Sequence, residues 1–135
     1  MRTKTCAGSI RAGRLAKAEQ FQSAALLVLA GASGDDDLAD AYVTLCVHAG
    51  IAAADVICCA RLGEHSQGEH HADAVTLLRR ADKPASDQLS ALLALKTKSG
   101  YSHATVTSAE LRRAGRAAAS LLDSARRAHA ARTGG

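Results

Sequence analysis

Hydrophobic residues are densest between residues 38 and 62, and their spacing there predicts one long helix. At 100° per residue, apolar side chains fall on two opposite faces and leave only a narrow polar stripe of Asp37, Thr44, His48 and Asp55. A helix that is apolar nearly all round is buried, either by neighbours of its own chain or by a partner subunit. Gly63 is well placed to end it. We therefore expect this segment to be the core helix.

Helical spacing of apolar residues also marks the segments around it. The predicted helices cover 11–30, 38–62, 72–81, 84–98 and 108–128, of which 72–81 is short. Thr107 and Glu110 form a capping box at the start of the last one. The fold class is thus all-α, an up-and-down bundle of four main helices plus one short helix in a single domain over residues 11–128. Residues 1–10 and 129–135 are expected to be disordered, and the polar connection 64–71 to be irregular.

Amino-acid composition indicates the kind of core and the cellular compartment. Hydrophobic residues make up 47% of the chain but aromatic residues only 2%, which favours an Ala, Leu and Val core of closely spaced helices. Three of the four cysteines lie on the core helix, and this pattern favours reduced, buried thiols over a disulfide framework. No uninterrupted apolar run of 18 residues and no signal peptide is recognised. We therefore expect a cytoplasmic protein without a membrane span.

Positive charge is concentrated at both ends of the chain. Residues 1–20 carry five Lys or Arg against one Glu, and residues 108–135 carry six Arg against two acidic residues. The terminal segments could form an RNA-facing surface, make an acid-to-base contact between subunits, or simply be solvated helix faces. Arg112, Arg113 and Arg116 are the candidate nucleic-acid contacts on the last helix.

The most metal-like stretch is 64–71, with His65, His70 and His71 beside two glutamates. Its spacing fits neither H-E-x-x-H nor the paired Glu-x-x-His motifs of di-iron bundles. We expect these histidines to be surface or capping residues, and we expect no metal or other cofactor.

Two further groups could carry chemistry. On the core helix, Thr44 and His48 are one turn apart, and His48 is either a hydrogen-bonded interior residue or part of a cleft that also concerns Asp55. The second group is the turn 96–103, which collects Lys96, Lys98, Tyr101 and His103. Lysine can hold a phosphate and imidazole can transfer protons, the minimum for cleaving RNA through its 2′-hydroxyl, although an ordinary solvated turn has the same composition.

Three segments together resemble the HEPN superfamily of small all-α proteins of toxin–antitoxin, defence and nucleotidyltransferase-associated systems. They are AYVTLCVHAGIAAADVICCARLG, GEHHADAVTLL and LLALKTKSGYSHATVTSAELRRAGRAAASLL, and the similarity spans residues 38–127. Members that cleave RNA carry R-x4–6-H near the start of the final helix and act as symmetric dimers. Here the nearest match has Lys96 or Lys98 before His103, and lysine lacks the forked, permanent charge of arginine. The resemblance to non-catalytic members instead rests on Lys96 and Tyr101.

The resemblance implies a non-catalytic homodimeric module that binds RNA, a nucleotide or a cognate protein, with an antitoxin or a nucleotidyltransferase as possible partner. One alternative is a ribonuclease toxin that uses Lys96 or Lys98 and His103. The other is a nucleic-acid-binding accessory protein led by the basic final helix. We expect no membrane partner under any of these three hypotheses.

Overall fold

The computed structural model describes residues 1–34, 37–68 and 70–134. The expectation of an all-α bundle is confirmed, with a minor two-stranded sheet added. In chain order the elements are β1 (Thr3–Thr5), α1 (Gly8–Gly31), α2 (Ala39–Leu62), β2 (Glu64–Ser66), α3 (His71–Ala81), α4 (Lys83–Leu93), α5 (Lys96–Gly100) and α6 (Ser108–Gly134).

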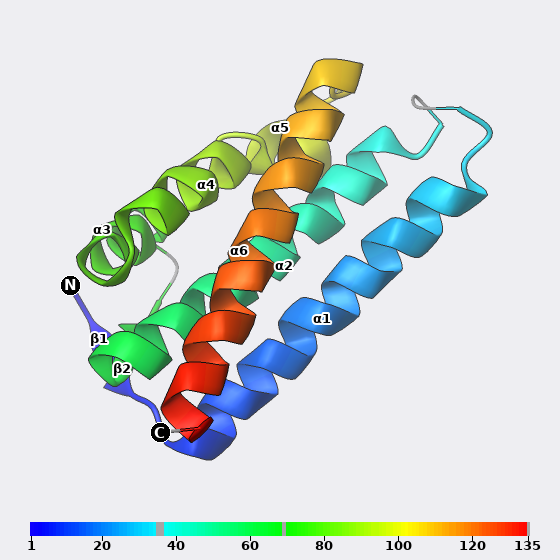
Figure 1. Ribbon diagram of the computed structural model, residues 1–135. Coiled ribbons are helices and arrows are strands. Elements are labelled where there is room, and N and C mark those ends of the chain that lie inside the picture. Colours follow the sequence, from blue (N-terminus) through cyan, green and yellow to red (C-terminus); the bar gives the residue numbers. More distant parts are fainter. Residues whose placement is uncertain (35–36, 69, 135) are drawn as a thin grey trace.

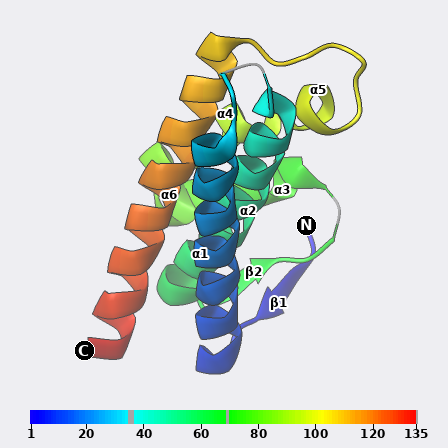
Figure 2. The ribbon, with the colours of Figure 1, turned by 90° about the vertical axis from the view of Figure 1, so that its right-hand side faces the viewer.

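Helix α2 is the core of the bundle, as its pattern predicted. It lies between α1 and α6 (Figure 1), and a view from the side shows α6 on one side and α5 with the β1–β2 pair on the other (Figure 2). Its central residues Val43, Cys46, Ala53, Val56 and Ile57 are fully buried. All the neighbours that bury them belong to the same chain. Burial of α2 therefore does not require a second subunit, and the argument for a homodimer from this helix no longer holds.

Small residues allow α2 to pack closely. At Gly50, a Cβ atom would overlap Cδ1 of Leu92 on α4 and would lie 3.2 Å from Cδ1 of Leu121 on α6. Both leucines are fully buried. The alanine-rich composition thus corresponds to closely spaced helices, as expected.

Among the described residues, α2 is also long and apolar enough to cross a membrane, judged by length and composition alone. However, 67% of its most apolar 18-residue window is buried inside the fold, as in the core helix of a soluble protein. The expectation of no membrane span relied on the lack of an unbroken apolar run. Helix α2 meets the criterion of length and composition without such a run, because alanine and cysteine raise its mean hydropathy.

The N-terminal segment is ordered, and this corrects the expectation of disorder for residues 1–10. Strand β1 pairs antiparallel with β2, with Lys4 opposite His65, so the connection 64–71 is not irregular throughout either. The amide of Cys6 donates to the carbonyl of Gly63 at 3.0 Å, and α1 already begins at Gly8. The predicted disorder of 129–135 is also wrong for its described part, because α6 continues to Gly134.

A disulfide joins Cys6 to Cys59, which contradicts the prediction of four reduced thiols. Only Cys46 and Cys58 are free and buried as expected. Burial raises the pKa of Cys46 to about 11 and that of Cys58 to about 12, so both stay protonated. The expected cytoplasmic location rested on reduced thiols, and the thiols no longer support it.

The predicted helix 84–98 is divided in two. Helix α4 ends at Leu93, and the separate α5 begins at Lys96 after a turn in which Leu95 is buried. Asp82 caps α4 by accepting from the amide of Ala85 at 3.0 Å, with Pro84 in the first turn. The division lets α5 lie against the N-terminal half of α2, at Thr44 to His48.

Candidate functional site

A pocket of about 140 Å³ lies between α2 and α5. It combines Thr44 and His48 of the polar stripe with the lysine- and tyrosine-containing turn, two features that the sequence presented separately. The lining residues are Thr44, Val47, His48, Lys96, Ser99, Gly100 and Tyr101.

Two hydroxyl groups fix α5 onto α2 at this pocket. The hydroxyl of Thr44 donates to Oγ of Ser99 at 3.2 Å, and Ser99 in turn donates to the carbonyl of Lys96 at 3.3 Å. Ser99 is buried. The position of Lys96 relative to α2 is therefore set by a short chain of hydrogen bonds.

The Lys96 ammonium group is held by a histidine from another element. Its Nζ lies 2.6 Å from Nε2 of His71 at the start of α3. Since an ammonium can only donate, His71 must accept and be neutral. Burial and the charge of Lys96 lower the pKa of His71, which agrees with that state. One N–H of Lys96 is thus used, and the other two remain for a ligand.

His48 and Tyr101 contribute rings to this region. The His48 side chain is exposed and stacks on Phe21 of α1, with ring centroids 5.3 Å apart. The interpretation of His48 as a hydrogen-bonded interior residue is therefore wrong, and it lines a pocket instead. Tyr101 is 80% exposed, so a face of its ring is accessible to a planar ligand.

Asp55 is not part of the pocket. Its carboxylate accepts a hydrogen bond from Nε of Arg14 on α1 at 3.0 Å, and Nη2 of Arg14 lies at the same distance. Burial raises the pKa of Asp55, although the Arg14 guanidinium opposes that effect. The pair joins α1 to α2, which is a structural role.

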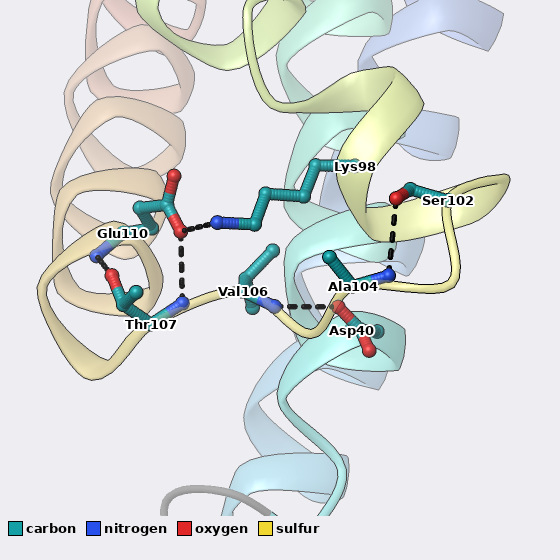
Figure 3. A network of polar contacts seen from close by, with 7 residues as sticks. All are labelled: Asp40, Lys98, Ser102, Ala104, Val106, Thr107 and Glu110. Atoms are coloured by element: carbon teal, nitrogen blue, oxygen red, sulfur yellow. Dashed lines mark hydrogen bonds and ion pairs between the residues drawn. The ribbon is translucent and has the colours of Figure 1, made fainter.

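Lys98, the alternative to Lys96 in the predicted catalytic group, does not line the pocket. Nζ of Lys98 lies 2.8 Å from Oε1 of Glu110, which also accepts from the amide of Thr107 (Figure 3). These contacts lower the pKa of Glu110 to about 2. The predicted capping box is confirmed, since the Glu110 amide donates back to Thr107. Lys98 therefore fastens α5 to the start of α6.

The loop after α5 passes Asp40 at the start of α2 before α6 begins at Ser108. Its course is held by two hydrogen bonds, from the Ala104 amide to Ser102 and from the Val106 amide to Asp40 (Figure 3). His103 lies in this loop, is exposed and does not line the pocket. The predicted combination of Lys96 or Lys98 with His103 is therefore not assembled in the pocket.

The remaining candidates lie elsewhere. Arg112, Arg113 and Arg116 are exposed on α6 and do not line the pocket. Nδ1 of His65 contacts the carbonyl of Ser66 at 2.9 Å, and His70 is exposed. Within residues 1–34, 37–68 and 70–134, no group of three His, Cys, Asp or Glu side chains is placed to hold a metal. Glu69 of the histidine-rich stretch lies outside the described residues.

Comparison with known proteins returns no family for this chain. No protein-family model, no curated protein and no solved structure matches it. The HEPN resemblance therefore stays a sequence-based interpretation.

Proposed function

We propose that this chain is a small helical module that binds a nucleotide unit, free or within single-stranded RNA, at the α2–α5 pocket without cleaving it. The observation that carries the proposal is the position of Lys96. Its ammonium group is held by neutral His71, and Lys96 lines the same pocket as Tyr101, whose ring is exposed. The positive charge of Lys96 can bind the phosphate of a nucleotide, and the exposed ring of Tyr101 can stack on its base.

The size of the pocket supports partial insertion of the ligand. A cavity of about 140 Å³ is smaller than the roughly 300–1,000 Å³ of pockets that enclose a small molecule. A phosphate can enter and contact Lys96 and the hydroxyl groups, while the base stays outside on Tyr101. Stacking of a base on an aromatic side chain contributes about 1–3 kcal/mol and tolerates any base.

Binding is supported better than cleavage. Cleavage through a 2′-hydroxyl needs an acid and a base at the reacting phosphate. His71 already accepts from Lys96, and His103 is not among the residues that line the pocket. The charge of Lys98 is compensated by Glu110. Among the residues that line this pocket, His48 is the imidazole, and a single imidazole does not supply both an acid and a base.

The test is a binding titration of the full chain with a fluorescein-labelled single-stranded RNA 12-mer and, separately, with a nucleoside monophosphate. We expect Lys96→Gln to weaken binding by about tenfold or more, since hydrogen bonds to charged groups contribute about 1.5–3 kcal/mol. Tyr101→Ala should weaken it by about 1–3 kcal/mol. Lys17→Gln is the matched control, because Lys17 is an exposed lysine on α1. Equal loss in Lys96→Gln and Lys17→Gln would contradict the pocket as the binding site.

Incubation of the same RNA with the protein separates binding from catalysis. The proposal predicts intact RNA after prolonged incubation. RNA cleavage that disappears in His103→Ala would instead establish the ribonuclease alternative.

From the HEPN resemblance, the proposal also includes a homodimer and a cognate antitoxin or nucleotidyltransferase as partner. Light scattering at micromolar concentration tests the dimer, and a monomeric mass would remove it from the proposal.

A further inference from the structure

A second cleft lies at the C-terminal ends of α2 and α6. Both helices end in the lower part of the bundle in Figure 1. The cleft has a volume of about 430 Å³. It shares no residue with the α2–α5 pocket. We call it the arginine cleft; its lining consists of Ala60, Arg61, Arg127, Ala128, Ala131 and Arg132.

Among the described residues, no acidic side chain forms an ion pair with the three guanidinium groups of the arginine cleft. The adjacent Arg126 differs, because it lies within 3.8 Å of Glu19 and 3.6 Å of Asp123. Within the described part of the chain, acidic side chains thus neutralise the positive charge of Arg126 beside the cleft but not that of the arginines that line it.

Most hydrogen-bond donors of these arginines are also available. Nη1 of Arg61 reaches the carbonyl of Ala81 at 3.5 Å, and Nη2 of Arg127 reaches Oγ of Ser124 at 3.3 Å. A guanidinium has five N–H donors, so four remain on each of these two side chains. The contacts hold the side chains in place and leave donors for a ligand.

Stabilisation of helix ends explains only part of this arrangement. Arg61 and Arg132 lie in the last turns of α2 and α6, where a cation offsets the negative end of the helix dipole. Arg127 lies before the last turn of α6 and has no such role. The three alanines leave the space between the arginines open, whereas larger side chains would fill it.

We infer that the arginine cleft is a binding site for phosphate groups, separate from the α2–α5 pocket. Guanidinium groups bind phosphate through paired hydrogen bonds, and a phosphate offers enough oxygen atoms for more than one arginine. The phosphates could belong to a free polyphosphate or to an RNA backbone, since the same chemistry serves both.

The experiment compares two probes by isothermal titration calorimetry on the full chain. The probes are inorganic tripolyphosphate and a single-stranded RNA 12-mer without terminal phosphates. The test variant is Arg127→Gln, because Arg127 is not needed at a helix end. The matched control is Arg116→Gln, an exposed arginine of the same helix outside the cleft.

We expect Arg127→Gln to weaken binding by about tenfold or more and Arg116→Gln by less than about twofold. Selective loss for tripolyphosphate identifies a free phosphate chain as ligand, and selective loss for RNA identifies the backbone. Undetectable binding of both probes, or equal losses in the two variants, overturns the inference. Arg127→Gln should leave the Lys96-dependent binding of the nucleoside monophosphate unchanged, because Arg127 does not line the α2–α5 pocket, so that failure of this site and failure of the α2–α5 pocket are distinguishable.

Discussion

The disulfide between Cys6 and Cys59 should contribute a large share of the stability. The bridge joins residues 53 positions apart, and both α1 and most of α2 lie inside the closed loop. The chain-entropy relation for a loop of this length corresponds to about 4 kcal/mol at 25 °C. A domain of this kind is stable by only about 5–15 kcal/mol in total. Replacing both cysteines by serine should therefore remove a quarter or more of the free energy of unfolding.

Urea unfolding followed by circular dichroism measures this effect. The wild type should lose about 4 kcal/mol when a reducing agent is added. The Cys6→Ser/Cys59→Ser variant should be less stable from the start and should not respond to the reducing agent. A loss below about 1 kcal/mol in this variant would refute the reasoning from loop length.

Thiol titration checks the bridge itself. Protein purified without reducing agent should show two reactive thiols in denaturant, those of Cys46 and Cys58, and four after reduction. In the native state these two should react slowly, because burial keeps them protonated. Four reactive thiols in denaturant without reduction would show that the bridge is not formed.

Two further predictions concern packing and charge. Gly50→Ala should destabilise by about 0–2 kcal/mol, since overpacking against Leu92 costs about 1–3 kcal/mol and the better helix propensity returns about 1 kcal/mol. Gly13→Ala, with nothing within 4 Å of the added atom, should instead stabilise by about 1 kcal/mol, and equal urea midpoints for the two variants would contradict the packing at Gly50. An NMR titration should give Glu110 a pKa of about 2, and Lys98→Met should raise it towards 4.5. Because the pKa of Glu110 is lowered in the folded state, the ionised carboxylate contributes its full stabilising effect above pH 4.5, and this contribution is lost as the pH falls through about 2. A wild-type pKa near 4.5 would exclude the contact with Lys98.

The helices could be predicted from the sequence wherever local pattern decides them. The apolar spacing of 38–62 placed α2 within one residue of its start, and Gly63 ends it in the left-handed conformation that glycine favours. The capping box of Thr107 and Glu110 is likewise local. These features depend on residues a few positions apart, so one sequence is enough to recognise them.

The N-terminal structure could not be predicted, because its partners are distant in sequence. Strand β1 is too short to show a period, and it is held by β2 and by a disulfide to Cys59. Nothing near Cys6 indicates that partner.

For the candidate site, the sequence identified the residues but not their grouping. Thr44 and His48 were predicted as one cleft candidate, and Lys96 and Tyr101 as parts of another; the division between α4 and α5 brings them together. The contact of Lys96 with His71 spans 25 residues and has no local signal. His103 does not line the pocket, and the sequence could not show this because the direction of a loop does not follow from helical spacing.

The enclosure of α2 by its own chain also determines when the protein can complete its core during synthesis. Helix α2 ends at Leu62, whereas α6 ends at Gly134, so 72 more residues must be added before the side of α2 that faces α6 is fully covered. At about 5–20 residues per second, that interval is about 4–14 s. Throughout it, the nascent chain presents an apolar helix that resembles a membrane span in length and composition. Chaperone capture or mistaken membrane targeting is therefore a hazard of translation that ends only when the last helix leaves the ribosome.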